Sequence, residues 1–251
     1  MEQPQQFPSF LGLGTQKGGT TTLQQLLEQH PQVFLPPAKE LHFFSLHYSQ
    51  GAAWYARQFS AAGPGQCIGE ITPYYLFHPQ AAARIADLLP QARLLVLLRD
   101  PVERTLSQVF HSQRLGFELL DVEEALAAET QRLEGAEVVL QAADGRHRSH
   151  QEHSYLARSR YEQQLAVYER HFRRDQLLIL RSEDLFADPE PLWQRVLQFL
   201  GLASVPLPQL PRANAGAGEA QAVAPAVRRR LRQQLEPTYQ QLQERYGIAW
   251  S

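Results

Sequence analysis

Apolar residues in this chain follow two patterns, short unbroken runs and longer stretches in which they recur three or four positions apart. Unbroken runs are typical of strands buried on both faces of a parallel sheet. Apolar residues at helical spacing are typical of helices that bury one face. We expect strands at residues 10–13, 66–73, 94–98 and 177–180, and helices at residues 50–59, 79–89, 121–134, 158–172 and 192–200. This alternation predicts an α/β fold, with a P-loop-like central parallel sheet flanked by helices, in a single domain.

The stretch from Phe10 to Leu26 combines a strand, a tight turn and the start of a helix. Four glycines interrupt the apolar run where the backbone must turn and pass close to a ligand. Thr20, Thr21 and Thr22 follow and offer an N-cap and three hydroxyls. A helix N-terminus with free N–H groups, together with Lys17 in the turn, indicates an anion-binding site.

The position of Lys17 within this loop does not fit the nucleoside triphosphate motif. A Walker A loop has the pattern GxxxxGK[ST], with its lysine after the last glycine. Here Lys17 comes before Gly18 and Gly19. The alternative to an anion site is a plain glycine- and threonine-rich turn with a solvated lysine.

The segment from Lys39 to Phe44 is predicted to be extended, since Pro36 and Pro37 precede it. Side chains alternate on a strand, so Glu40 and His42 are expected on one face. A carboxylate and an imidazole beside an anion loop are suitable for acid/base chemistry. The alternative is an edge strand whose polar side chains face solvent while Phe43 packs into the core.

Two further polar groups follow predicted strands. Arg99 comes directly after residues 94–98, and Asp100 fits the N-cap of the next helix. Ser107 lies two turns along that helix, so Arg99 and Ser107 together suit a second phosphate. A Walker B role for Asp100 is the alternative, which the missing Walker A motif weakens. Residues 66–73 are expected to form a strand that runs into a turn, with Glu70 at the end of the strand, where open α/β sheets place ligand-binding groups. A structural role for Glu70 is equally open.

Composition narrows the class of protein. The chain has 251 residues, 43% of them hydrophobic and 20% charged, with a net charge of −2. That charge argues against a protein that coats nucleic acid or an anionic membrane. Cys67 is the only cysteine, which excludes an internal disulfide and a CxxC motif. With no signal-like start and no apolar run near 18 residues, we expect a cytoplasmic chain without a membrane segment, or a soluble domain excised from a longer protein.

We expect a loose tail at residues 1–8 and one domain over residues 9–251. Residues 203–224 are rich in proline, alanine and glycine and predict a long loop. Pro225 is expected to start a last helix, which Pro237 kinks or splits.

Residues 135–157 are harder to interpret from sequence. His147, His150 and His153 are three apart and could hold a metal, but nothing nearby fixes such a site. We therefore expect a mobile loop on the substrate side.

Together these blocks resemble the sulfotransferases that use 3′-phosphoadenosine 5′-phosphosulfate (PAPS), in the branch of heparan sulfate and related bacterial sulfotransferases. The resemblance covers nearly the whole chain and rests on QKGGTTTL, KELHFF, GEITPYY, LLVLLRDPVERTLSQ, RSRYEQQL and LRSEDLFADP, in the family's order. It implies an enzyme that moves a sulfuryl group from PAPS to a hydroxyl or amine of an acceptor such as a carbohydrate or small metabolite. The implied product is 3′-phosphoadenosine 5′-phosphate (PAP), with no metal required.

The resemblance also implies roles for individual residues. The cradle of the 5′-phosphosulfate would consist of Gln16, Lys17, Gly18, Gly19, Thr20 and Thr21, and the 3′-phosphate pair of Arg99 and Ser107. The implied catalytic residues are Lys17, which contacts the sulfuryl group and leaving phosphate, Glu40 as base, and His42 as its partner or substitute. The candidate substrate-binding residues are Glu70, Arg158, Ser159 and Tyr161.

The sequence departs from the heparan 3-O enzymes at three places. Ile71 stands where those enzymes carry a lysine, and Ser45 where they carry an aspartate. Their disulfide-containing loop is absent, and its place falls near Arg212 and Asn214. The motifs that indicate donor binding are present despite these departures. The departures speak against a polyanionic acceptor, which needs a strongly basic cleft.

Two other functions remain as alternatives. A P-loop nucleotide kinase would require ATP and Mg²⁺, and the position of Lys17 speaks against it. A non-catalytic nucleotide-binding domain would keep the anion site and tolerate replacement of Glu40 and His42.

Overall fold

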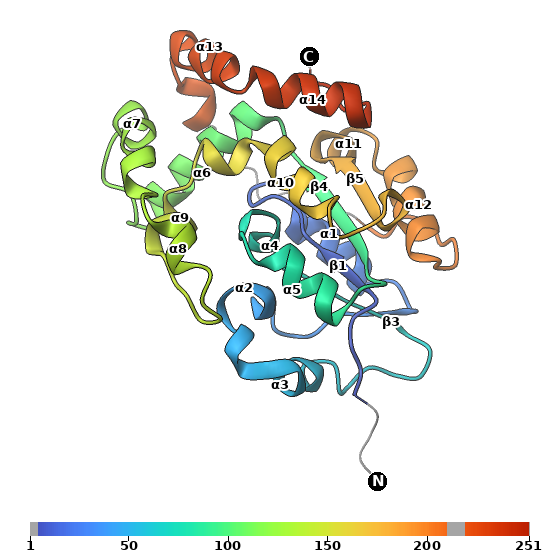
Figure 1. The fold of residues 1–251 in the computed structure, drawn as a ribbon. Coiled ribbons are helices and arrows are strands. Elements are labelled where there is room, and N and C mark those ends of the chain that lie inside the picture. The colour runs from blue at the N-terminus through green and yellow to red at the C-terminus, as the bar shows by residue number, and fades with distance from the viewer. Residues whose placement is uncertain (1–4, 210–218, 251) are drawn as a thin grey trace.

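A computed structural model describes residues 5–209 and 219–250. The five strands in these ranges form one parallel sheet in the order β2-β3-β1-β4-β5, with helices on both faces (Figure 1). The strands are β1 (Phe10–Gly12), β2 (Val33–Phe34), β3 (Cys67–Ile71), β4 (Arg93–Leu98) and β5 (Leu177–Arg181). The predicted α/β class with a central parallel sheet is confirmed.

The side chains of β4 explain why this strand is an unbroken apolar run. Leu94, Val96 and Leu98 pack on one face of the sheet, and Leu95 and Leu97 pack on the other. None of the five is more than 1% exposed. Each buried side chain of this size contributes about 1.5–3 kcal/mol, so both faces need helical cover.

Helices α1 and α12 cover one face, and α5, α10 and α14 pack on the other. The helices are α1 (Thr20–Glu28), α2 (Phe43–Leu46), α3 (Gly51–Arg57), α4 (Tyr74–Phe77), α5 (Ala81–Leu88), α6 (Pro101–Arg114), α7 (Val122–Arg132), α8 (Ala136–Val139), α9 (Arg148–Glu152), α10 (Tyr161–Tyr168), α11 (Ser182–Ala187), α12 (Pro189–Leu200), α13 (Pro225–Gln234) and α14 (Glu236–Tyr246). The predicted cap at Asp100 is confirmed, since its Oδ1 accepts a hydrogen bond from Glu103 N at 2.9 Å. The predicted split at Pro237 is also confirmed.

The prediction of an extended segment from Lys39 to Phe44 is wrong. Glu40 and His42 have φ angles of 56° and 52°, in the left-handed region, and α2 begins at Phe43. Phe43 and Phe44 are both buried, so the expected alternation of faces does not occur. Leu41, Phe43 and Phe44 all belong to one buried cluster, which side chains that alternate along a strand would not form.

Other local predictions also need correction. Helix α1 begins after Gly19, which has a φ of 87°, and no threonine side chain caps it. Helix α11 directly follows β5 and was not among the predicted helices. Strand β2 was not predicted, since it has only two residues at the edge of the sheet. Residues 135–157 contain α8 and α9.

The predicted tail and the long loop are described in part. The ring of Phe7 lies 6.3 Å from that of Tyr55, while residues 1–4 lie outside the described residues. The boundary at residue 9 stays a prediction. Residues 210–218, which include Arg212 and Asn214, also lie outside the described residues.

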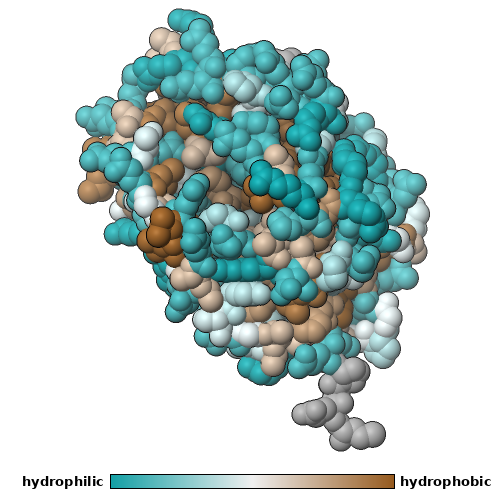
Figure 2. All heavy atoms as spheres, viewed as in Figure 1, coloured by the Kyte–Doolittle hydropathy of each residue, from teal (hydrophilic) through white to brown (hydrophobic). Residues whose placement is uncertain are grey.

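Hydrophilic residues cover most of the face in Figure 2, and apolar residues gather in a few places. Leu119 and Val138 are the most exposed of the large apolar side chains in the described residues, at 91% and 73%. Within the same ranges, we find no helix with both the length and the apolar content needed to cross a membrane.

Candidate functional site

The candidate site begins with the loop of residues 14–19, which we call the anion loop, at the carboxyl end of β1. Its backbone is fixed by bonds from Thr15 N to Leu97 O and from Gly18 N to Thr15 O, each 2.9 Å long. A Cβ at Gly18 would lie 2.6 to 3.0 Å from atoms of Thr15 and Leu97, so only glycine fits there. Lys17 adopts a φ of 70° within this loop. The loop therefore has a tight backbone that presents Lys17 at its tip.

The N-terminus of α1 follows directly and carries N–H groups that a helix cannot satisfy internally. Thr22 N and Leu23 N are the first that bond back, both to Gly19 O. Thr20 is buried, whereas Thr21 is exposed and its Oγ1 accepts a bond of 2.6 Å from Lys39 Nζ. This arrangement suits an anion with several oxygens.

Positive charge concentrates around the loop. Burial lowers the pKa of Lys17, and Arg114, Arg99 and Lys39 lower it further by repulsion. Burial together with Lys17 and Arg114 likewise lowers the pKa of His111. Cations that repel one another without a ligand favour a multiply charged anion, which would relieve that repulsion.

Glu40 and His42 come together despite the wrong prediction of a strand. His42 Nε2 lies 3.6 Å from Glu40 Oε2, and His42 Nδ1 lies 3.2 Å from Ser45 Oγ. Lys39 Nζ lies 3.7 Å from Glu40 Oε1, so Lys39 joins Glu40 to the first turn of α1 through Thr21. The predicted acid/base pair is thus placed beside the anion loop.

The pKa of Glu40 reflects these neighbours. Burial alone would raise it, but the hydrogen bonds and charges of His42 and Lys39 outweigh burial and lower it. Glu40 therefore stays ionised to a lower pH than an ordinary glutamate in the ligand-free protein. A bound anion would raise this pKa again and make the carboxylate a stronger base.

The backbone at these positions is strained. Lys17, Glu40 and His42 are the non-glycine residues with positive φ in the described part of the chain. Such conformations cost on the order of 1–3 kcal/mol each and cluster at functional sites. The three residues are also the three predicted catalytic residues.

Glu70 is placed differently from an open binding group. It is 1% exposed and accepts hydrogen bonds from Tyr55 Oη at 2.6 Å, Tyr75 Oη at 2.9 Å and Thr72 Oγ1 at 3.0 Å. Burial raises its pKa, and these three bonds only partly offset the rise. Its predicted substrate contact stays a prediction.

We expect Tyr55→Phe to lower the free energy of unfolding by about 1–3 kcal/mol, because it leaves a buried carboxylate with fewer donors. Fewer donors also raise the pKa of Glu70 further, so the deficit should shrink as the pH falls and Glu70 takes up a proton. Urea denaturation at several pH values measures both effects. Tyr48→Phe, at a half-exposed tyrosine nearby, is the control, and an unfolding free energy that does not change in Tyr55→Phe would contradict the interpretation.

Arg99 lies at the carboxyl end of β4 as predicted. Its Nη1 donates to Lys17 O at 3.3 Å, and Tyr161 Oη donates to Arg99 O at 3.0 Å. Ser107 lies on α6 and is half-buried. The structure brings Arg99 into contact with the loop, and the 3′-phosphate role of Arg99 and Ser107 stays a prediction.

Arg158 and Ser159 lie in a 3₁₀ turn (Ala157–Ser159) before α10, and both are buried. Arg158 Nη1 donates to Gln16 Oε1 in the anion loop. Ser159 Oγ accepts from Arg104 Nε at 2.5 Å. Arg158 therefore reaches the candidate site, whereas Ser159 supports a neighbouring buried arginine.

Sequence reasoning missed three charged or titratable residues near the loop. Lys39 precedes Glu40 directly, and its contact with Thr21 needed the fold. His111 and Arg114 follow Ser107 by four and seven residues on α6, which places them on one helical stripe. That spacing is the signal that could have found them.

The three histidines of the predicted loop are engaged separately. His147 Nδ1 accepts from His150 N at 3.2 Å, and His150 Nδ1 contacts Tyr74 Oη at 2.7 Å. His153 Nε2 bonds to Phe117 O at 3.0 Å. These contacts hold α9 in place and leave the three rings with different partners.

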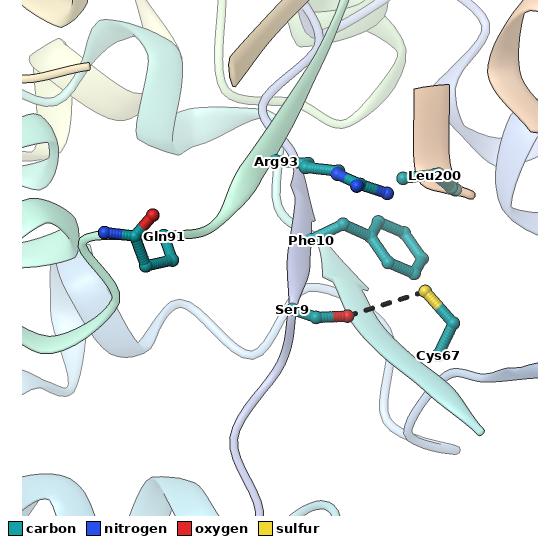
Figure 3. A pocket seen from close by; sticks show the side chains of 6 residues that line it. All are labelled: Ser9, Phe10, Cys67, Gln91, Arg93 and Leu200. Carbon is teal, nitrogen blue, oxygen red and sulfur yellow. Dashed lines mark hydrogen bonds between the residues drawn. The ribbon is translucent and has the colours of Figure 1, made fainter. Parts of the chain in front are cut away.

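Two cavities lie away from these residues. One of about 330 Å³ lies at the amino ends of the strands, beside Cys67 and Arg93 (Figure 3). Within it, Cys67 Sγ lies 3.5 Å from Ser9 Oγ. The other, of about 880 Å³, lies between α7 and α13. None of the predicted site residues lines either cavity.

Several known proteins are similar to this chain in sequence or structure. The sequence profile of the sulfotransferase domain matches residues 8–210. Similar curated proteins include the membrane-associated sulfotransferase kil1 of Dictyostelium discoideum, 43% identical over 42% of this chain. Heparan sulfate glucosamine 3-O-sulfotransferase 3A1 of Mus musculus is 31% identical over 81% of this chain. The matches span 23% and 48% of those relatives' own lengths. A solved sulfotransferase from Alicyclobacillus acidocaldarius superposes with a TM-score of 0.80 and 27% identity, over 98% of each chain.

Proposed function

Because the chain belongs to the sulfotransferase family, we propose that it transfers a sulfuryl group from PAPS to a hydroxyl or amine of an acceptor. One observation carries this proposal. The non-glycine residues with left-handed backbone in the described ranges are Lys17, Glu40 and His42, which converge on one anion loop. Strain of this kind persists only where the surrounding structure enforces it.

The donor fits the residues of the loop. PAPS carries a phosphosulfate and a 3′-phosphate, so it supplies the negative charge that Lys17, Arg99 and Arg114 favour. The free N–H groups at the start of α1 would bind phosphosulfate oxygens. Arg99, which contacts the backbone of Lys17, would bind the 3′-phosphate through its planar fork.

The proposed reaction is an in-line displacement. The acceptor oxygen or nitrogen forms a bond to sulfur while the bond from sulfur to the bridging phosphate oxygen breaks. Lys17 would stabilise the charge that grows on the leaving 5′-phosphate. Glu40 takes the proton from the acceptor, and His42, 3.6 Å away, orients Glu40 or replaces it as base. By analogy with phosphoryl transfer, most of the rate enhancement comes from positioning and charge neutralisation.

The acceptor class is a carbohydrate or a small metabolite. One relative is named for heparan sulfate glucosamine, a carbohydrate. Ile71, however, stands where the heparan 3-O enzymes carry a lysine, and it is buried and provides no positive charge for a polyanion. We therefore favour an acceptor with fewer charges than heparan sulfate. The cytoplasmic location stays a prediction, and the relative kil1 is named membrane-associated.

A thermal-shift titration with PAP beside ATP plus Mg²⁺ tests the donor site. A ligand at 100 times its Kd that binds only the folded chain adds about 2.7 kcal/mol. We expect PAP to raise the midpoint and ATP with Mg²⁺ to leave it unchanged. Stabilisation by ATP and Mg²⁺ alone would favour a nucleotide kinase. Binding of PAP without turnover in the wild-type chain would favour a non-catalytic nucleotide-binding domain.

We expect Arg99→Ala to weaken PAP binding about 10-fold or more, since charge-assisted hydrogen bonds contribute about 1.5–3 kcal/mol. Isothermal titration calorimetry measures the change. Arg195→Ala, at an exposed arginine on α12, should leave the affinity unchanged. Equal PAP affinity in Arg99→Ala and the wild type would remove Arg99 from the 3′-phosphate site.

A further inference from the structure

Arg158 connects three parts of the molecule that are distant in sequence. Its Nη1 donates to Gln16 in the anion loop, and its Nη2 donates to His150 O at 2.8 Å and Gln151 O at 3.1 Å on α9. The side chain is 3% exposed. A guanidinium with this many fixed partners is held rigidly, and moving it would move the loop and α9 together.

Aromatic rings hold Arg158 from the other side. Its guanidinium carbon lies 5.2 Å from the ring centroid of Tyr74 and 5.0 Å from that of Phe77, both on α4. Tyr74 Oη also contacts His150 Nδ1 at 2.7 Å. Burial lowers the pKa of His150 to about 2, so the imidazole is neutral and shares one hydrogen bond with the tyrosine hydroxyl.

Tyr74 continues this set of contacts to the predicted base. Its ring centroid lies 6.0 Å from that of His42, and His42 Nε2 lies 3.6 Å from Glu40 Oε2. A continuous series of contacts therefore runs from Gln16, beside Lys17, through Arg158 and Tyr74 to His42 and Glu40. Its two ends are the strained segments of the candidate site.

We infer that Arg158 is a positioning residue that couples the anion loop to the Glu40–His42 pair through Tyr74, rather than a contact to the acceptor. This inference rests on the proposed function. Lys17 at one end, and Glu40 and His42 at the other, have left-handed backbone conformations. Such conformations persist only where surrounding contacts stabilise them. Filling the anion loop fixes Gln16, and through Arg158 and Tyr74 it fixes the ring of His42.

A double-mutant cycle on PAP affinity tests the coupling. Isothermal titration calorimetry gives the Kd of PAP for the wild type, His42→Gln, Arg158→Lys and the double variant. Arg158→Lys keeps the charge and removes the guanidinium contacts. We expect the effect of His42→Gln on Kd to change by about threefold or more when Arg158 is replaced, beyond the roughly twofold scatter of independent sites.

Two further variants make the test specific. Tyr155→Phe removes a buried tyrosine hydroxyl that donates to Glu118 at 2.8 Å, away from this series of contacts. Its effect should combine additively with that of His42→Gln. If Arg158→Lys does not fold, Gln16→Ala removes the other end of the same contact and should give the same non-additivity.

The outcomes separate the inference from the proposed function. Failure of the wild type to bind PAP would overturn both. PAP binding with additive effects of His42→Gln and Arg158→Lys, or of His42→Gln and Gln16→Ala, would overturn the coupling alone. Equal non-additivity with Tyr155→Phe would also overturn it, because the effect would then follow from general loosening of the fold.

Discussion

Glu40→Gln is expected to lower turnover about 10²- to 10⁴-fold, the usual effect of removing a general base. The glutamine amide keeps the size of the side chain but cannot take the proton from the hydroxyl or amine of the acceptor substrate. PAP affinity should stay within a few-fold of the wild type, because Glu40 contacts Lys39 and His42 rather than the N-terminus of α1. Turnover with an accepted substrate and calorimetry with PAP measure the two effects separately.

Glu244→Gln, at an exposed glutamate on α14, serves as the matched control and should leave turnover unchanged. Full turnover in Glu40→Gln would show that the base assignment is wrong. A large loss in His42→Gln alongside it would then transfer the role to the imidazole.

Lys17→Ala is expected to lower turnover about 10²- to 10³-fold, as removal of a preorganised electrostatic contact does elsewhere. The ammonium would act on charge that develops on the leaving phosphate, so the rate should fall more than the PAP affinity. Burial and neighbouring cations lower the pKa of Lys17. The wild type should therefore lose PAP affinity at a lower alkaline pH than an ordinary lysine would require.

Lys17→Arg tests the charge directly, because arginine stays protonated across this range. We expect the alkaline loss of PAP affinity to disappear in Lys17→Arg. If the loss persists unchanged, another group titrates. Arg195→Ala again serves as the distant control, since Arg195 is exposed on α12.

The anion loop was predictable because its parts are close in sequence. Lys17, Gly18 and Gly19 occupy one turn between a buried strand and a helix, and their order excluded a Walker A motif. Arg99 was predictable for a similar reason, since it directly follows an unbroken apolar strand. Parallel strands bring their carboxyl ends to one edge of the sheet, so both predictions point to the same place.

The proximity of Glu40 and His42 was predicted from an extended backbone conformation that the structure does not have. Alternation along a strand placed them on one face, whereas two left-handed residues bring them together. Positive φ is uncommon for residues other than glycine, so sequence-based reasoning does not suggest two such residues here. The burial of Leu41, Phe43 and Phe44 stabilises it in the folded chain.

The sequence by itself determined the fold class and the family and predicted an anion site in the loop between β1 and α1, because each depends on residues that are neighbours along the chain. Only the tertiary structure decided that Glu70 is enclosed by three hydroxyls and that Arg158 reaches Gln16, 142 residues away. Such contacts depend on how the helices pack on the sheet. The packing energy is the total of many small contributions from residues far apart in the chain, so it cannot be predicted from any single stretch of sequence.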